Sequence, residues 1–315
     1  MKDLVIYSTP PPAAQSELDS LRERFIGSRD VSDASREQYR HALDFFLRWL
    51  TAEGIRNPTR EDLVRYKQML IESGLSSYTV SLRLTTLRMF FSWLKEEERY
   101  PDIGRHLKTM KVPRQFSKDP LTLEQCRMLL DSIDTGTVIG LRDFAIINLL
   151  MQTGLRTIEV IRADIGDMRQ DSGQPVLWVQ GKGRDTKDSF VVLTHGTVMP
   201  IMKYLAARKE HDPAAPLFVS TSSNNRDRRL TTRTIRGIVK TALRGIGIDS
   251  LRISAHSLRH TAITLALKAG SSVQEVMTMA RHSSLDTTLI YSHNMDRVAH
   301  APERRIENLL KIQHE

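Results

Sequence analysis

The stretch AHSLRHTAIT, residues 255–264, places two histidines and an arginine at the start of an apolar helical pattern. His256, Arg259 and His260 lie three and four residues apart, so a helix brings them to one edge. That edge lies at the helix N-terminus, where free N–H groups and the helix dipole favour an anion. An arginine adds a planar fork that can hold two phosphate oxygens. The stretch therefore indicates phosphate binding, with a capping histidine and a surface ion pair as the structural alternative.

The sequence on either side of this stretch extends the helical pattern. Four residues at spacings of four, three and four predict the buried stripe of one helix: Leu258, Ala262, Leu265 and Ala269. Ser272 and Glu275 form a capping-box pattern for a next helix, which is expected to end at His282. Residues 283–293, SSLDTTLIYSH, then predict a turn into a further helix that carries Tyr291.

The composition is that of a basic globular protein. Its 315 residues include 46 Lys and Arg against 37 Asp and Glu, which gives a formal net charge of +9. Such an excess suggests a polyanionic partner, most often a nucleic acid. The single cysteine, Cys126, is in phase with Leu129 and Leu130, which indicates a small buried residue rather than a nucleophile. No signal peptide and no apolar run of the ~20 residues that a membrane helix needs are present, so we expect a soluble cytoplasmic protein.

The N-terminal part of the chain predicts an all-helical domain. Residues 1–15 contain three prolines and indicate a flexible leader, and a helical domain is expected over 16–110. Four segments have helical spacing: 16–27, 35–50, 59–74 and 76–94. Helix caps are expected at Ser35 with Gln38, at Thr59, and at Thr122 with Gln125, and Gly74 is expected to end the third helix. Residues 111–120, KVPRQFSKDP, read as an exposed linker.

The remaining residues, 121–315, predict a second domain with a small sheet. GLRDFAIINLLMQTG, residues 140–154, indicates a buried helix that a C-terminal glycine ends. QPVLWVQ, 174–180, and DSFVVLT, 188–194, predict the two strands of a β-hairpin around GKGRDTK. Helices are expected again from Thr231. The fold class is therefore mainly α with a small β-sheet.

Further residues with potential chemistry stand at element ends. Arg156 lies in TGLRTIEV between two helical patterns, and Glu159 can reach back to steady the backbone or the arginine. Lys182 lies between two glycines at the hairpin tip. Taken singly, these residues are better explained without function: Arg156 as a surface ion pair, Lys182 as a solvated turn lysine and Tyr291 as a packed aromatic.

Taken together and in this order, the motifs resemble the tyrosine recombinases, the phage-integrase, Xer and Cre superfamily. H-x-L-R-H at 256–260 and H-S-S-x-x-T-T-x-x-Y at 282–291 carry the resemblance, with TGLRTIEV and the hairpin GKG before them. It covers the whole second domain, and the first is similar to the family's core-binding domain. The resemblance implies a helical core-binding, DNA-binding domain over 16–110 and a mixed α+β catalytic domain over 121–315 that ends in a docking tail.

The resemblance implies a catalytic set: Arg156, Lys182, His256, Arg259, His282 and Tyr291. In this set the two arginines would hold the scissile phosphate. Lys182 would protonate the leaving 5′ oxygen, and Tyr291 would be the nucleophile that forms a 3′-phosphotyrosyl link. His256 would transfer protons and hydrogen-bond, and His282 would bond a phosphate oxygen.

Five more residues have weaker assignments. The resemblance implies that Glu159 supports the site, and we interpret His260 as structural. The family often has glycine where Arg281 stands, so we expect either another backbone geometry there or a contact with DNA. Arg40 and Arg83 flank the apolar stripes of the first domain and are candidate DNA contacts, with solvated surface charge as the alternative.

The chemistry needs no cofactor. A phosphodiester is already negative, so a metal-free enzyme must supply positive charge where charge builds up. The sequence contains no phosphate-binding G-x-x-x-x-G-K-[ST] loop and no convincing acidic metal cluster. His256, His260, His282 and His293 fit no usual zinc spacing, and the neighbouring arginines would repel a dication. We therefore expect no metal, no cofactor and no ATP.

The expected function is site-specific recombination of double-stranded DNA with inverted core-type half-sites. The partners implied are a homo-tetramer, or a hetero-tetramer with a paralogue, and accessory proteins. Ile306, Leu309 and Leu310 can form an apolar face that docks on a neighbouring subunit or on its own domain. The alternatives are a type IB topoisomerase-like or hairpin-forming strand transferase, and a non-enzymatic DNA-binding relative. Integration or excision of a mobile element and Xer-type dimer resolution both stay open.

Overall fold

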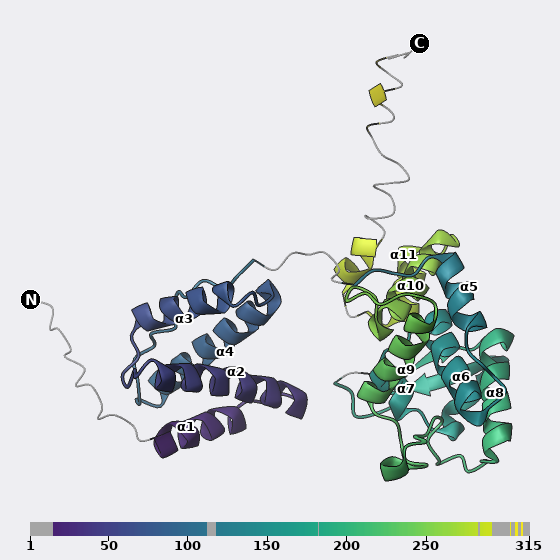
Figure 1. Ribbon diagram of the computed structural model, residues 1–315, viewed down its shortest axis with the longest axis horizontal. Coiled ribbons are helices and arrows are strands. Elements are labelled where there is room, and N and C mark those ends of the chain that lie inside the picture. The colour runs from purple at the N-terminus through teal and green to yellow at the C-terminus, as the bar shows by residue number, and fades with distance from the viewer. Residues whose placement is uncertain are drawn as a thin grey trace, which may run out of the picture. The chain divides into compact units, whose positions relative to one another are not determined.

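The computed structural model of the protein describes residues 15–111, 118–181, 183–282 and 284–291, and the single positions 303, 306, 307 and 310. The chain divides into two units, Met1–Arg114 and Gln115–Glu315 (Figure 1). Most of the predicted leader and residues 112–117 of the predicted linker lie outside the described residues.

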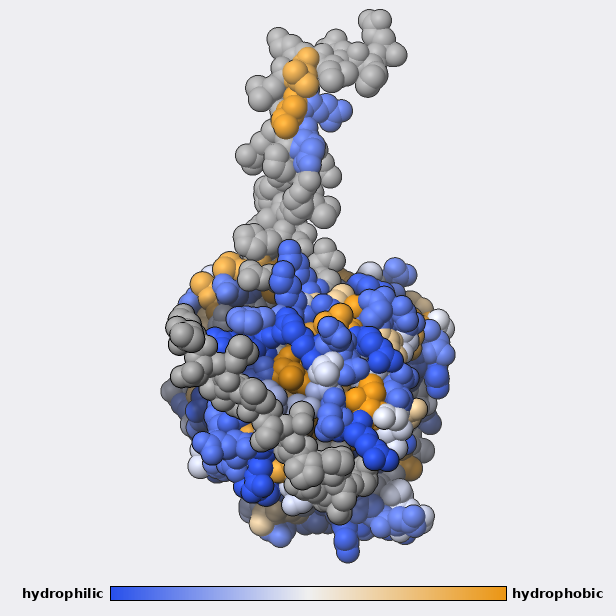
Figure 2. All heavy atoms as spheres, turned by 90° about the vertical axis from the view of Figure 1, so that its left-hand side faces the viewer, coloured by the Kyte–Doolittle hydropathy of each residue, from blue (hydrophilic) through white to orange (hydrophobic). Residues whose placement is uncertain are grey.

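The first unit is helical, as the spacing predicts. Its helices are α1 (Gln15–Gly27), α2 (Asp33–Ala52), α3 (Arg60–Glu72) and α4 (Ser77–Glu96). Their apolar faces meet in one core that includes Phe25, Phe46, Tyr66, Leu87 and Phe90. The face in Figure 2 carries mainly hydrophilic side chains with isolated apolar ones between them.

Local capping explains where these helices begin. The predicted box of Ser35 and Gln38 is wrong, because the N-cap of α2 is Ser32, whose side chain accepts from the backbone N–H of Ser35. Ser35 thus lies inside the first turn, behind an earlier serine that caps equally well. The predicted cap at Thr59 is confirmed, and Gly74 with φ +69° follows the end of α3.

The second unit combines seven helices and a small sheet among its described residues. The helices are α5 (Leu123–Asp131), α6 (Val138–Thr153), α7 (Thr157–Arg162), α8 (His195–Arg208), α9 (Thr232–Gly245), α10 (Ala255–Lys268) and α11 (Val273–Ala280). Residues 285–291 are helical as well. α6 is the central helix: it is largely buried and packs against α8 and α10. The predicted capping box of Thr122 and Gln125 opens α5.

The sheet has three antiparallel strands in the order β1 (Met168–Asp171), β2 (Gln174–Val179) and β3 (Ser189–Val192). β2 and β3 confirm the predicted hairpin. β1 was not predicted, because its sequence MRQD has no apolar alternation. The dipeptide Ser172-Gly173 joins β1 to β2 with positive φ at both positions, as a tight hairpin turn requires.

α8 was not predicted either, because Pro200 lies inside it. A proline has no N–H to donate to the carbonyl four residues before it, here that of Gly196. The buried side chain of Asn148 on α6 donates to this carbonyl instead, at 2.7 Å. A tertiary hydrogen bond thus replaces the missing helical one, and spacing within α8 cannot reveal it.

Gly154 ends α6 in the predicted way, with φ +63° and ψ +21°. A Cβ at this position would lie 3.4 Å from the Cβ of Ala262 on α10, so the turn passes close to that helix. The left-handed conformation is accessible to glycine without the steric cost that other residues meet. This turn places Arg156 directly beside α10.

Replacing Gly154 by alanine is expected to destabilise the second unit by about 1 kcal/mol or more, since alanine is strained at positive φ. The matched control is Gly237→Ala in the interior of α9, where a Cβ meets nothing within 4 Å. There alanine should stabilise by about 0.5–1 kcal/mol through helix propensity. Calorimetric unfolding of both variants tests this, and two shifts of the same sign would contradict the assignment.

Candidate active site

Segments far apart in the sequence meet at one place in the second unit. Arg156, at the junction of α6 and α7, donates to the backbone carbonyl of Arg281 after α11 at 3.4 Å. Arg259 on α10 donates to the last carbonyl of α11 and to the carbonyl that follows α6. The ring of His260 on α10 lies against Tyr291, with 5.2 Å between ring centroids. The structure thus brings together every predicted catalytic residue that it describes.

The centre of this arrangement is Glu159 in α7, which is fully buried. One oxygen of its carboxylate accepts from the backbone N–H of Arg156 at 2.6 Å, and the other from the guanidinium of Arg156 at 3.1 Å. Arg281 adds an ion pair at 2.9 Å. Burial alone would raise the pKa of Glu159, but Arg281 and the bonds from Arg156 hold it below its usual value. Glu159 therefore stays ionised and fixes both arginines.

Arg281 corrects one prediction. It does not need another backbone geometry, because it adopts the left-handed conformation itself, with φ +52° and ψ +49° at the C-cap of α11. Its side chain is only 11% exposed and bonds Glu159 and the carbonyl of Met279. The buried ion pair stabilises a conformation that glycine would otherwise favour. The same contacts turn the guanidinium toward Glu159, and the contact of Arg281 with DNA stays a prediction.

Arg259 is a buried cation, only 3% exposed. Burial, followed by the positive charges of Arg156 and Arg281, lowers its pKa to about 9, so it is still charged at neutral pH. Three guanidinium groups consequently surround the single carboxylate of Glu159. A positive excess of this kind, partly shielded from water, favours the binding of an anion such as a phosphate.

The predicted common edge for His256, Arg259 and His260 is wrong in part. His256 is exposed, whereas Arg259 and His260 are each only 3% exposed and lie inside the fold. The predicted stripe also ends early, because Ala269 is the exposed C-cap of α10, and Ile263 on another side of the helix is buried as well. Helical spacing shows on which side of a helix a residue lies, but not whether other segments cover that side. Here the segments that follow α6 and α11 cover a second side of α10.

The two histidines of α10 are in contact and share a lowered basicity. Their rings meet edge to face, with 4.7 Å between centroids. Partial desolvation of the ring by the surrounding protein, then the charges of Arg259 and Arg156, lower the pKa of His256. Burial, then His256, Arg259 and His282, lower that of His260 to about 4. The imidazole of His260 is therefore neutral at physiological pH and can accept a proton.

His282 is held by a residue that the sequence analysis did not single out. Its Nδ1 lies 2.8 Å from the hydroxyl of the buried Thr288. Burial and the charges of Arg259 and Arg156 lower the pKa of His282 to about 4, so its ring is neutral too. Thr288 lies in the motif H-S-S-x-x-T-T-x-x-Y, six residues after His282. This position in the motif was the one feature of the sequence that could have indicated its hydrogen bond to His282.

Tyr291 is 6% exposed and packs with Ile263, Val276 and Ala280. Its hydroxyl lies 2.7 Å from Nδ1 of His260. Burial raises the pKa of Tyr291 above its usual value, and Arg259 opposes that effect. The phenol is therefore protonated in this state, packed as the structural alternative expected but with its hydroxyl among the predicted catalytic residues.

Lys182, His293 and Leu309 lie outside the described residues. The turn that carries Lys182 is anchored on one side, because Arg162 of α7 donates to the carbonyl of Gly181 at 3.0 Å. Lys187 of the same turn pairs with two aspartates of the second unit. In the predicted docking tail, the single described positions Ile306 and Leu310 are 53% and 64% exposed.

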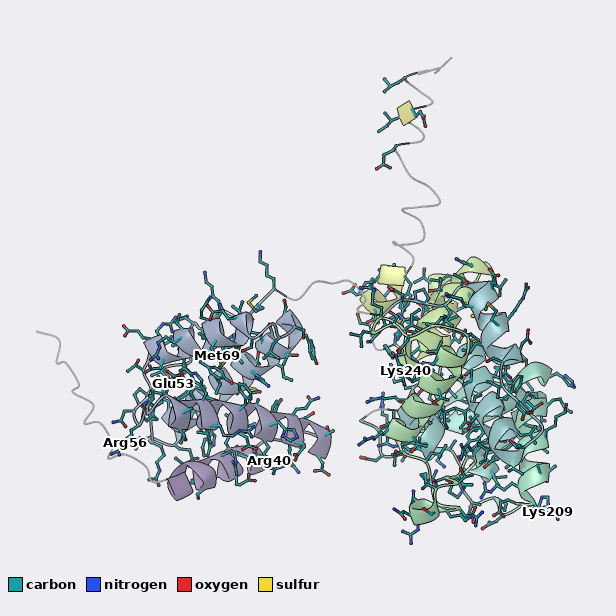
Figure 3. All side chains as sticks on the ribbon, in the orientation of Figure 1. Arg40, Glu53, Arg56, Met69, Lys209 and Lys240 are labelled. Atoms are coloured by element: carbon teal, nitrogen blue, oxygen red, sulfur yellow. The ribbon has the colours of Figure 1, made fainter. Side chains whose placement is uncertain are left out.

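The candidate DNA contacts of the first unit are engaged in contacts of their own. Arg40 forms ion pairs with Glu23 and Glu37 (Figure 3). The guanidinium of Arg83 lies over the ring of Phe45, 3.7 Å from its centroid. Both residues thus stabilise the packing of the first unit.

The described part of the chain contains neither a metal-binding cluster nor a membrane-spanning helix. No cluster of three or more histidine, cysteine, aspartate or glutamate side chains there could hold a metal ion. No helix in the described ranges is both long and apolar enough to cross a membrane.

Glu159 predicts a specific pH dependence of stability. Because its pKa is lowered in the fold, its contribution is present above its ordinary value of 4.5 and is lost as pH falls through the lowered value. Glu159→Gln should cost about 3 kcal/mol at neutral pH, because the arginines lose a buried partner. The difference from wild type should shrink in acid, as denaturation over a range of pH measures. Glu124→Gln, at an exposed position of α5, is the control, and a cost that does not change with pH would refute the assignment.

Arg281→Gly separates backbone strain from the ion pair. Glycine relieves about 1 kcal/mol of left-handed strain but removes a buried pair worth about 3 kcal/mol, so the variant should be less stable. Lys209, the exposed C-cap of α8 with φ +58°, offers the matched control (Figure 3). Lys209→Gly should stabilise the protein, because strain is relieved and no buried pair is lost. Stabilisation by Arg281→Gly in thermal unfolding would contradict the role of its ion pair.

Comparisons with known proteins agree with this geometry. Residues 120–297 match the phage integrase family, and residues 18–98 match the phage integrase N-terminal SAM-like domain. The chain is 31% identical over 286 residues to the tyrosine recombinase XerD of Yersinia pestis, across 87% of this chain and 92% of that protein. It is 31% identical over 287 residues to XerC of Corynebacterium glutamicum, across 89% of each chain.

Solved structures share the fold. A XerH site-specific recombinase bound to palindromic difH substrate, in a post-cleavage complex, aligns with a TM-score of 0.71 and 21% identity, over 95% of this chain and 84% of that one. A lambda integrase dimer bound to a COC′ core site aligns with a TM-score of 0.67 and 15% identity, over 85% and 96%. The chain therefore belongs to the phage integrase family and is a Xer-like tyrosine recombinase, an enzyme of site-specific DNA recombination.

Proposed function

We propose that Tyr291 cleaves DNA by attacking a phosphodiester that Arg156 and Arg259 hold. The observation that carries the proposal is the excess of positive charge around Arg259, which interacts electrostatically with Tyr291. Three arginines, Arg156, Arg259 and Arg281, are set there against the one carboxylate of Glu159. Such charge stabilises the additional negative charge that develops on the phosphate in the transition state. The described side chains supply it without a metal ion, so no cofactor enters the proposal.

The reaction balances within these residues and the DNA. The hydroxyl oxygen of Tyr291 forms a bond to phosphorus while the bond from phosphorus to the 5′ oxygen breaks, which leaves a 3′-phosphotyrosyl link. The phenol gives its proton to an imidazole of the site, and Lys182 gives one to the leaving 5′ oxygen. Attack by a 5′ hydroxyl from another duplex reverses these steps and exchanges the strands. No net hydrolysis occurs, so the bond energy is conserved and ATP is not required.

The histidines have supporting tasks in this proposal. His282, held by Thr288 at Nδ1, directs its other ring nitrogen as a hydrogen-bond donor to a phosphate oxygen. His256 is exposed at the N-terminal end of α10 and is placed to exchange protons with the phosphate or with water. Both remain neutral until the phosphate arrives, because desolvation, followed by the charges of Arg259 and Arg156, lowers their pKa values.

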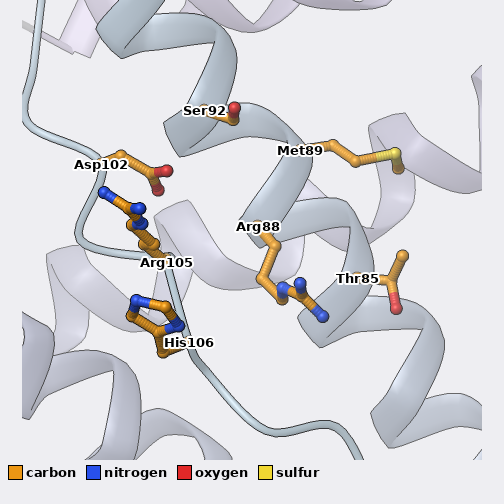
Figure 4. A pocket seen from close by; sticks show the side chains of 8 residues that line it. Thr85, Arg88, Met89, Ser92, Asp102, Arg105 and His106 are labelled. Carbon is orange, nitrogen blue, oxygen red and sulfur yellow. The ribbon is translucent and has the colours of Figure 1, made fainter.

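The first unit contributes DNA binding in this proposal. A hollow beside α4 has Arg88 on the helix and Arg105 and His106 on the loop that follows it, together with one carboxylate, Asp102, and neutral side chains of α4 (Figure 4). The loop lies close on the helix at Gly104, where a Cβ would be 3.0 Å from the Cα of Arg88. Because Arg40 and Arg83 are engaged elsewhere, Arg88 and Arg105 are the better candidates for phosphate contacts.

The proposed partner is a DNA duplex with inverted core-type half-sites. The palindromic substrate of the XerH complex and the core site of the lambda integrase dimer support this for relatives of the same fold. We propose that four subunits, identical or paired with a paralogue, act on two duplexes in the cytoplasm, with accessory proteins selecting the pairing. The same chemistry serves integration, excision and dimer resolution.

Tyr291→Phe should abolish covalent cleavage and leave DNA binding within a few-fold. The probe is a nicked duplex selected by wild-type protein from a randomised library, through capture of detergent-resistant protein–DNA adducts in a chelator. Adduct formation and gel-shift affinity are then measured for both proteins. The control is Tyr78→Phe, at an exposed position of α4, which should form the adduct normally. An adduct of Tyr291→Phe at the wild-type rate would reject Tyr291 as nucleophile.

A further inference from the structure

We propose that His260 is the general base of cleavage: its Nδ1 takes the proton of the Tyr291 hydroxyl as the oxygen attacks phosphorus. The sequence analysis interpreted His260 as structural, and the geometry assigns it a chemical step. The inference rests on the proposed function, because it requires Tyr291 to be the nucleophile.

Geometry is the first support. Nδ1 of His260 lies 2.7 Å from the hydroxyl oxygen of Tyr291, within the range of direct proton transfer. Both side chains are buried, at 3% and 6% exposure, so water does not readily compete for this bond. His260 directly follows Arg259 on α10, and the same helical turn therefore presents the base and one phosphate-binding arginine.

The other two histidines are occupied differently. Nδ1 of His282 is bonded to Thr288, and the ring of His282 is stacked on Tyr291 with centroids 6.4 Å apart. His256 meets the ring of His260 edge to face and is exposed. Neither of these arrangements directs an imidazole nitrogen at the tyrosine hydroxyl as that of His260 does.

The protonation states suit the direction of transfer. Burial, then the neighbouring His256, Arg259 and His282, lower the pKa of His260 to about 4, with Asp119 acting in the opposite sense. Burial raises the pKa of Tyr291, so its proton stays on oxygen before DNA binds. The tyrosine therefore donates to Nδ1, and the imidazole proton resides on Nε2.

Proton transfer is coupled to the attack. As the bond from oxygen to phosphorus forms, the phenol oxygen loses electron density and its proton becomes strongly acidic, so Nδ1 can take it. The phosphate brings negative charge next to the resulting imidazolium and offsets the repulsion from the arginines. In the rejoining step the imidazolium returns the proton to the departing oxygen of Tyr291, which restores the starting state.

Two substitutions separate proton acceptance from positioning. His260→Asn can keep an acceptor oxygen near the place of Nδ1, but an amide does not take the proton, and His260→Ala removes both functions. On the captured nicked duplex, both variants should form adduct about 10²–10⁴-fold more slowly than wild type. A His260→Asn variant at the wild-type rate would reduce His260 to a positioning residue. A variant faster than wild type would mean that the hydrogen bond restrains the tyrosine, and either result overturns the proposal.

A substrate with sulfur in place of the bridging 5′ oxygen distinguishes base from acid. A thiolate leaves without a proton, so Lys182→Ala should regain adduct formation on this duplex while His260→Asn should not. Recovery of His260→Asn on the sulfur substrate would overturn the assignment. Wild-type adduct formation, and its loss in Tyr291→Phe, report on the proposed function itself, so the two failures are distinguishable. His211→Ala, exposed in the second unit, is the control for histidine loss.

A measurement on the protein without DNA tests the hydrogen bond between His260 and Tyr291 directly, so the conclusion does not depend on how well the His260 variants fold. In wild-type protein, the ¹⁵N chemical shift of Nδ1 in His260 should be that of an unprotonated, hydrogen-bonded nitrogen, with the proton on Nε2. In Tyr291→Phe it should move toward the value of an unprotonated nitrogen that has lost this bond. A protonated Nδ1 in wild type at neutral pH would contradict the proposal. Circular dichroism and DNA affinity show whether the His260 variants are folded.

Discussion

Three guanidinium groups lie around the one buried carboxylate of Glu159, and this imbalance of charge governs the site. The carboxylate fixes Arg156 and Arg281, while Arg259 donates to the backbone carbonyls of Gly154 and Ala280. An ionised group so far from water is costly unless opposite charge approaches it. In the proposed function the negative phosphodiester supplies this opposite charge. The folded site therefore favours binding of the substrate. Electrostatic stabilisation is present before the DNA arrives and needs no later rearrangement.

Desolvation and neighbouring positive charge together determine what the histidines can do. Desolvation is the largest cause that lowers the pKa values of His256, His260 and His282, and the positive charge of Arg259 adds to it in each case. Neutral imidazoles can accept or donate a proton, whereas imidazolium can only donate. Their hydrogen-bond partners then divide the tasks between them: Thr288 bonds one ring and Tyr291 another. The task of each histidine therefore depends on where its ring lies relative to the arginines and on which hydroxyl its ring nitrogen bonds.

The sequence predicts those features that depend on neighbouring residues. The cap at Thr59, the capping box at Thr122, the glycine end of α6 and the hairpin of β2 and β3 follow from local patterns, and the structure has them. α8 was missed because its proline is tolerated only through Asn148, a contact between distant residues. The spacing of residues along the chain does not predict a conformation that depends on a hydrogen bond between residues distant in sequence.

The site itself shows the same division. Motif order suggested which side chains come together, and the described ones do. Spacing did not show that Arg259 and His260 are buried, since the covering segments follow α6 and α11, which are distant in sequence. Nor did it reveal that Arg281 takes a glycine's conformation, because its partner Glu159 is 122 residues earlier. The contact between His260 and Tyr291 was hidden for the same reason.

The most direct test of the account is to find the amino acid that carries the DNA. The captured adduct is digested with nuclease and trypsin, and the peptides are sequenced by mass spectrometry. Cleavage after Arg281 and Arg297 isolates the peptide HSSLDTTLIYSHNMDR. The account predicts a 3′-linked nucleotide phosphate on Tyr291 in this peptide. The phosphate on any other residue, or no covalent nucleotide at all, would contradict the claim that this cationic site directs a tyrosine onto DNA.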